Sequence, residues 1–126
     1  MASPTQDRRY GVVGNVAFKA PVTVATTANI TLSGTTQTID GVTMASSYRV
    51  LVKDQTDSAD NGIYDVDTSS WTRSYDFNSN YDVKRGTLVY VTQGTSVGKG
   101  LWTVTAADPI TIDTDDITFA SVLLTT

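Results

Sequence analysis

The chain contains no cysteine and no histidine, and all 13 of its acidic residues are aspartate. Without cysteine there is no disulfide bond, no thiolate metal ligand and no thiol nucleophile. Without histidine the chain lacks the usual general base of hydrolases and the commonest metal ligand. We therefore predict that the protein is not an enzyme and that it binds neither a metal ion nor a cofactor.

The charge and the hydrophobic pattern exclude two further classes of partner. A net charge of −4 is unfavourable for binding a polyanion, so we expect no nucleic-acid partner. No apolar run approaches the roughly 20 residues that a membrane-spanning helix needs. No apolar stretch of signal-peptide length follows the basic residues near the N-terminus. We expect no contact with a membrane. We also expect that the protein is synthesised in a reducing cytoplasm.

The residues that are abundant favour strands. Val, Ile and Thr make up about a third of the 126 residues, and their branched side chains suit pleated strands better than helices. Short strand patterns alternate with Gly and Asp turns every 8 to 12 residues, which predicts one all-β domain, a small antiparallel barrel or sandwich. The expected strands are 22–26, 36–39, 48–53, 63–66, 71–73, 87–92, 101–105, 110–112 and 117–119.

Several local features refine this expectation. Asp40-Gly41 predicts a tight hairpin, and 110–112 with 117–119 predict the two arms of another hairpin across an aspartate-rich turn. Residues 78–83 are the one candidate for a helical turn. In the strand 87–92 the core face is either Leu88 with Tyr90 or Val89 with Val91.

The first 20 residues differ from the rest of the chain. They contain three basic residues and one acid, two glycines and neither helical nor strand periodicity. We predict an extended docking arm over residues 1–20 that precedes a compact β domain over residues 21–126; the alternative is a frayed terminus. The candidate docking residues are Arg8, Arg9, Tyr10, Val12, Val13, Val16 and Phe18.

Three segments imitate sites without meeting their requirements. Gly94–Gly100 has three residues between its first two glycines and a glycine after Lys99, so it is interpreted as a hairpin turn and not as a phosphate-binding loop. Asp54–Gly62 is not interpreted as a calcium loop, because a loop that starts at Asp57 has Ala59 at its third position and Thr68 where the closing Glu is needed. The aspartates at 113, 115 and 116 are interpreted as a solvated turn rather than a metal site.

The segment from Tyr75 to Asp82 combines aromatic rings with Asp and Asn side chains, which is the chemistry of a sugar-binding surface. The candidate glycan contacts are Tyr75, Phe77, Tyr81 and Asp82. The interpretation that we favour is structural, with this loop folded over one end of the β domain.

An ordered set of short segments resembles the module found near the N-terminus of many bacteriophage tail fibre and tailspike proteins. The resemblance covers about residues 22–120. It is carried by Val24–Gly34, Gln37–Val42, Arg49–Thr56, Asn61–Tyr64, Trp71–Arg73, Gly86–Val91, Gly94-Thr95, Trp102, Ile110–Ile112 and Ile117–Phe119.

The resemblance implies a small β domain on a trimeric appendage, between the end that anchors to the virion and the receptor-binding shaft. The expected function is that of a structural virion component, with the arm docking to phage tail, adaptor or portal-proximal proteins and the chain associating with itself as a homotrimer. Two alternatives stay open: a receptor-binding module that recognises a host-surface glycan, and a head fibre or capsid decoration protein.

Overall fold

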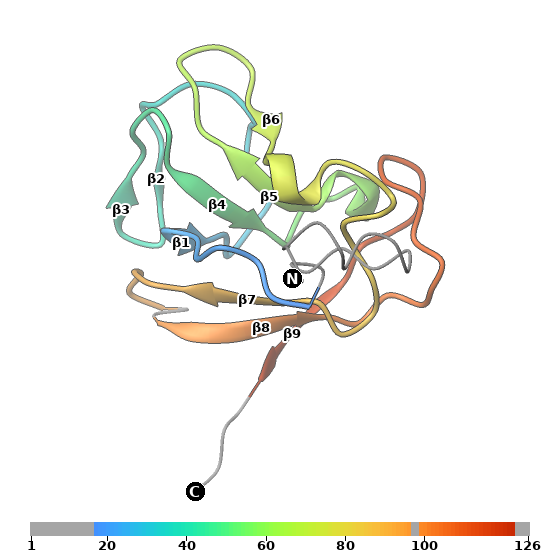
Figure 1. The fold of residues 1–126 in the computed structure, drawn as a ribbon. Helices are drawn as coiled ribbons and strands as arrows, with labels where there is room; N and C mark the ends of the chain where they lie inside the picture. The colour runs from blue at the N-terminus through green and yellow to red at the C-terminus, as the bar shows by residue number, and fades with distance from the viewer. Residues whose placement is uncertain (1–16, 97–98, 123–126) are drawn as a thin grey trace, which may run out of the picture.

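The computed structural model describes residues 17–96 and 99–122 and confirms the all-β class. Figure 1 shows short strands joined by long loops. The described residues also form two short 3-10 helices, η2 (Ser58–Asp60) and η3 (Tyr75–Phe77). The strands are β1 (Val24–Ala25), β2 (Thr38–Ile39), β3 (Val42–Thr43), β4 (Arg49–Val52), β5 (Gly62–Asp65), β6 (Thr72–Arg73), β7 (Leu88–Val91), β8 (Gly100–Val104) and β9 (Phe119–Val122).

These strands form three sheets, and within the described residues the sheets do not close into a barrel. One sheet has the order β1-β4-β5-β6, a second has the order β7-β8-β9, and β2 pairs with β3. All pairs are antiparallel except β1 with β4. No helix in residues 17–96 or 99–122 is long and apolar enough to cross a bilayer.

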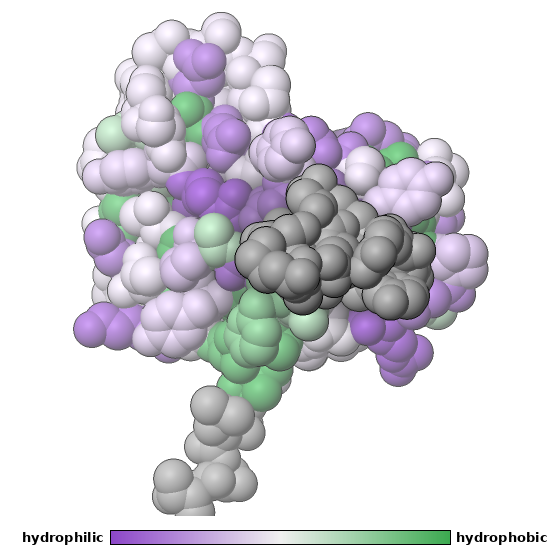
Figure 2. Space-filling view, viewed as in Figure 1, coloured by the Kyte–Doolittle hydropathy of each residue, from purple (hydrophilic) through white to green (hydrophobic). Residues whose placement is uncertain are grey.

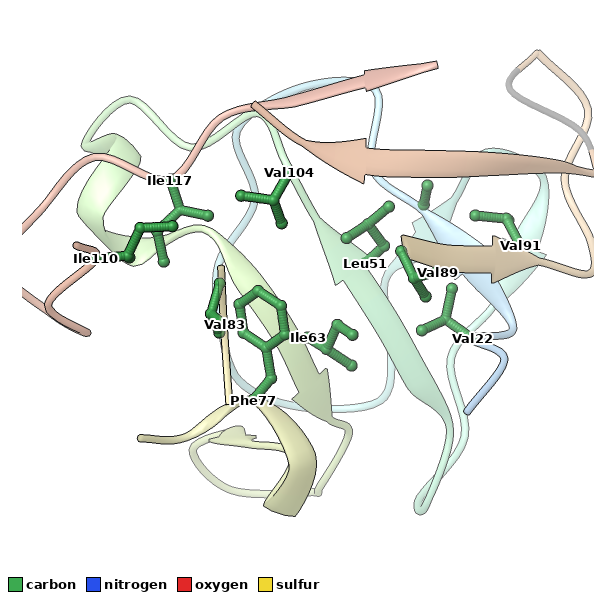
Figure 3. Packing of buried hydrophobic residues seen from close by; sticks show 11 residues of the cluster. Val22, Leu51, Ile63, Phe77, Val83, Val89, Val91, Val104, Ile110 and Ile117 are labelled. Carbon is green, nitrogen blue, oxygen red and sulfur yellow. The ribbon is translucent and has the colours of Figure 1, made fainter. Parts of the chain in front are cut away.

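The main core lies between the four-stranded sheet and the three-stranded sheet. Of the two faces that the sequence left open for β7, Val89 and Val91 point into this core. Phe77 is fully buried there, and its ring lies 6.2 Å from that of Phe119. Figure 3 shows the side chains of the cluster: Val22, Ala25, Leu51, Ile63, Phe77, Val83, Val89, Val91, Val104, Ile110 and Ile117.

A second core lies on the opposite face of the four-stranded sheet. Alternation along β4 sends Leu51 into the main core but Val50 and Val52 into the second core, because successive side chains of a strand point to opposite faces. The β2–β3 hairpin contributes to the second core, and its turn has positive φ at Asp40 (47°) and Gly41 (86°). The hairpin predicted from this dipeptide is therefore confirmed.

Two predicted local structures are wrong. Residues 110–112 form no strand; β9 begins at Phe119 and pairs with β8 instead. Ile110 and Ile117 are both buried in the main core, and this burial removes more apolar surface from water than an exposed two-stranded hairpin would. Residues 78–83 form a hydrogen-bonded turn and no helix: the N–H of Asp82 donates to the carbonyl of Ser79 (3.0 Å), and the Asp82 carboxylate accepts from the backbone N–H groups of Asn78 (3.1 Å) and Ser79 (3.0 Å).

Candidate functional site

The first described residues, 17–25, form a linking segment that joins the two larger sheets. It starts beside β7: the N–H of Leu88 donates to the carbonyl of Ala17 (2.7 Å), and the N–H of Lys19 donates to the carbonyl of Leu88 (2.9 Å). It then moves to the other sheet, where Val24 and Ala25 pair in parallel with β4. The last residues of the predicted arm are therefore held against the sheet, whereas Arg8, Arg9, Tyr10, Val12, Val13 and Val16 lie outside the described residues.

Arg49 fastens this segment to the loop that follows β6. Its guanidinium donates to both carboxylate oxygens of Asp76 (2.9 and 3.1 Å). The same side chain donates from Nη2 to the carbonyl of Ala20 (2.9 Å) and from Nε to that of Pro21 (3.4 Å). The Arg49 and Asp76 side chains are only 22% and 12% exposed, so this bidentate pair is better shielded than an ordinary surface ion pair.

Lys19 lies at the same junction with its side chain turned inward. The residue is 5% exposed, and its Nζ has no hydrogen-bond partner among the described residues. Burial lowers the pKa of the Lys19 amine, and the nearby Arg49 guanidinium lowers it further, whereas the carboxylates of Asp76 and Asp82 act in the opposite direction. The linking segment therefore carries a buried amine next to the acidic residues of the 74–83 loop.

The 74–83 loop divides its aromatic residues between the interior and the surface. Phe77 is fully buried, so it cannot contact a glycan in this fold. Tyr75 and Tyr81 are 89% and 81% exposed. Tyr75 precedes Asp76 and Tyr81 precedes Asp82, the two carboxylates that act on the pKa of Lys19. The loop thus both covers the main core and presents two tyrosines near the linking segment.

Phe18, the one described member of the predicted docking set, is exposed. Its side chain is 60% exposed, and its backbone forms a parallel bridge with Leu88. The structure thus brings the end of the predicted arm and the predicted glycan loop to one junction, a proximity that the sequence analysis did not foresee.

The segments that imitate metal or phosphate sites have structural roles. Asp57 caps η2 by accepting from the N–H of Ala59 (3.1 Å), and the buried Asn61 amide donates to the carbonyl of Ile117 (2.9 Å). Asp113 pairs with Arg73 (3.0 Å). Residues 94–99 connect antiparallel β7 and β8 along the chain, and Gly100 is the first residue of β8, as the interpretation as a hairpin turn requires. In residues 17–96 and 99–122, no group of three or more acidic side chains is placed to hold a metal ion.

Sequence reasoning missed Lys19, Arg49 and Asp76 as a connected group. Arg49 and Asp76 are 27 positions apart, and neither lies in a motif that predicts the other. The one available signal was a charged residue at the start of an otherwise apolar strand, Arg49 before Val50. Comparison of the chain with known protein families, with curated proteins and with solved structures finds no significant match.

Proposed function

We propose that this chain is the N-terminal attachment module of a phage tail fibre or tailspike, a structural virion component that anchors the appendage to the tail and has no enzymatic activity. In this proposal residues 1–16 dock to a tail, adaptor or portal-proximal protein, and the β domain orients the rest of the appendage. The proposal rests on the sequence resemblance together with one structural observation, the attachment of the linking segment.

That observation is the way in which the chain is held where it joins the domain. Backbone hydrogen bonds tie residues 17–22 to β7, and the Arg49 guanidinium ties Ala20 and Pro21 to Asp76. A load applied to the preceding residues would thus be shared by many bonds in two sheets and not concentrated on a single loop. Such a junction suits a module whose task is to transmit force between an anchor and an appendage.

The test uses virions and an antibody raised against the purified full chain. We expect electron microscopy to find the label at the tail, and we expect deletion of residues 2–16 to remove the label while the protein still accumulates in the cell. A label on the capsid would instead identify a head fibre or decoration protein. Normal tail labelling by the deletion variant would show that the docking surface lies on the β domain.

A second candidate function, recognition of a host-surface glycan, is favoured by the exposure of Tyr75 and Tyr81. Exposed aromatic faces stack on sugar rings. Asp82 is less available than the sequence suggested, because one of its oxygens already accepts two backbone N–H groups. Calorimetric titration with host surface polysaccharide is the test, and binding that survives the double substitution Tyr75→Ala and Tyr81→Ala would exclude this loop as the site.

A further inference from the structure

The outer face of the β7–β8–β9 sheet, which points away from the main core, is covered by hydrophobic side chains. Its members follow from the strand register, since paired residues share a face: Leu88 pairs with Thr103 and Thr103 with Ala120, whereas Tyr90 pairs with Leu101 and Leu101 with Val122. Phe18 extends the first row through its bridge with Leu88. We call this seven-residue surface the outer sheet face.

The outer sheet face is accessible in the single chain. Phe18 is 60% exposed and Tyr90 42% exposed, Ala120 is exposed, and the other four residues are half-buried. Figure 2 shows hydrophobic residues gathered at the lower end of the molecule, where β9 leaves the domain in Figure 1. In the sequence, Leu123 and Leu124 follow Val122 directly, so the run of apolar residues continues beyond Val122.

The strands of this sheet are apolar on both faces. Val89, Val91 and Val104 fill the main core from the inner face, while Leu88, Tyr90 and Leu101 lie on the outer face. A strand with one face in water normally alternates apolar and polar residues, and a strand with apolar residues on both faces is typical of a sheet that is covered on both sides. The pattern therefore indicates that a second layer covers the outer sheet face.

The charge distribution points to a second copy of this chain as that layer. None of the seven residues is charged, although the chain has 22 charged residues and a net charge of −4. Two copies with the same net charge repel one another, so an uncharged face is where they can meet at least electrostatic cost. The face offers few hydrogen-bonding groups, only the hydroxyls of Thr103 and Tyr90, which suits another apolar sheet better than a glycan or a charged peptide.

We infer that copies of this chain associate through their outer sheet faces, sheet against sheet, with Tyr90 and Leu101 near the centre of the contact. Sheets pack in this way at a separation of about 10 Å. The inference deepens the proposed function and rests on it in one respect, because it supplies a surface through which copies of the appendage module would meet.

The test is sedimentation equilibrium of the purified full chain over a range of concentrations. We expect a mass above that of the monomer, and we expect association to strengthen when salt is added, since salt screens the repulsion between acidic copies. Tyr90→Lys should weaken association at least tenfold. The matched control is Tyr75→Lys, the same change at an exposed tyrosine outside the outer sheet face, which should leave association unchanged.

Each result either supports or overturns the inferred association through the outer sheet face. Circular dichroism melts show whether both variants fold. If Tyr90→Lys does not fold, Phe18→Lys repeats the test at a second exposed position of the outer sheet face. A monomeric wild-type chain, or equal association of Tyr90→Lys and Tyr75→Lys, would overturn the inference. If the chain is monomeric but the antibody label is still found at phage tails, only this interface is refuted. If the chain associates but no label is found on virions, only the proposed function is refuted.

Discussion

Lys19 is buried and its amine has no hydrogen-bond partner in the part of the chain that the structure describes, and this combination makes the stability of the fold depend on pH. Because the pKa of its amine is lowered in the folded chain, the unfolded chain binds more protons at pH values between the lowered pKa and the ordinary lysine value of about 10.4. Stability therefore increases with pH across that window. Below the window the amine is charged in both states, and the folded state carries the full cost of its burial.

The substitution Lys19→Met tests this conclusion, since methionine keeps an unbranched chain and removes the ammonium. We expect the variant to be more stable than the wild type at pH 7 by on the order of 1 kcal/mol, because an unsatisfied buried donor is removed. The advantage should shrink as the pH approaches 10. Urea unfolding at several pH values measures the difference in the free energy of unfolding between the variant and the wild type. Lys84→Met, at an exposed position, is the control. A less stable variant at pH 7 would mean that attraction by Asp76 and Asp82 outweighs the burial cost.

Gly62 is the residue whose replacement should be most disruptive among the described glycines. Its φ is 153°, and a Cβ there would clash with Nη1 of Arg73 and lie 3.2 Å from the Phe77 ring. Arg73 cannot move freely, because it donates to the carbonyls of Asn61 and Ala59 (both 2.8 Å) and pairs with Asp113. A side chain at position 62 would therefore disturb both an ion pair and the main core.

We expect Gly62→Ala to lower the free energy of unfolding by about 3 kcal/mol or more, from backbone strain together with the loss of Arg73 hydrogen bonds. Gly86→Ala is the matched control. Gly86 also has positive φ (95°), but a Cβ there meets nothing within 4 Å, so only strain of about 1–2 kcal/mol should appear. Chemical denaturation of the two variants gives the comparison, and equal losses would contradict the role assigned to Arg73.

At the level of elements, strands and their turns were predicted more reliably than the partners with which the strands pair. The Asp40-Gly41 dipeptide predicted the β2–β3 hairpin, and the polar loop that ends at Asn61-Gly62 separated the two predicted strands that pair as β4 and β5. The sequence pattern was wrong for the local hairpin predicted across residues 110–119, and it predicted no partner where pairing is distant: the linking segment contacts β7 through Val22 and β4 through Val24, partners about 70 and 26 positions away. The local alternation of side chains does not indicate which distant strand is the partner. Residues Val22–Thr26 could therefore be predicted as a strand but not as the link between two sheets.

The attachment of the linking segment leads to a prediction about local opening. Arg49→Met removes the guanidinium that holds Ala20, Pro21 and Asp76 but keeps an apolar stem of similar length. We expect amide hydrogen exchange to become faster at Lys19 and Val22, whose N–H groups donate to β7. Exchange at Thr26, which donates to the carbonyl of Leu51, should be unchanged. Equal acceleration at all three amides would indicate global destabilisation instead of local release.

For the molecule as a whole, composition was enough to predict an all-β domain, whereas the candidate site was not predictable. Two of the four candidate glycan contacts, Tyr75 and Tyr81, are exposed, yet Phe77 in the same run of polar residues is completely buried. Nothing in the sequence separates these aromatic residues, because burial here depends on how η3 sits over the main core. The same limit applies to Lys19, since a lysine near an N-terminus is normally solvated.

Truncation tests where the domain begins. The sequence favoured a boundary after residue 20, but the bonds between residues 17–22 and β7 and the burial of Lys19 place residues 17–20 within the folded unit. We expect deletion of residues 2–16 to leave the melting temperature within a few degrees of the wild type, because the backbone bonds described for the linking segment are kept. Deletion of residues 2–20 removes two bonds to β7 and the carbonyl of Ala20 that Arg49 binds. It should lower the melting temperature by roughly 5–10 °C, as expected when these three hydrogen bonds, each worth about 1 kcal/mol or less, are lost from a chain of this size. Differential scanning calorimetry of the two truncated chains decides between the boundaries: identical melting temperatures would restore the one after residue 20, and a large loss on the shorter deletion would place residues 2–16 within the folded unit as well.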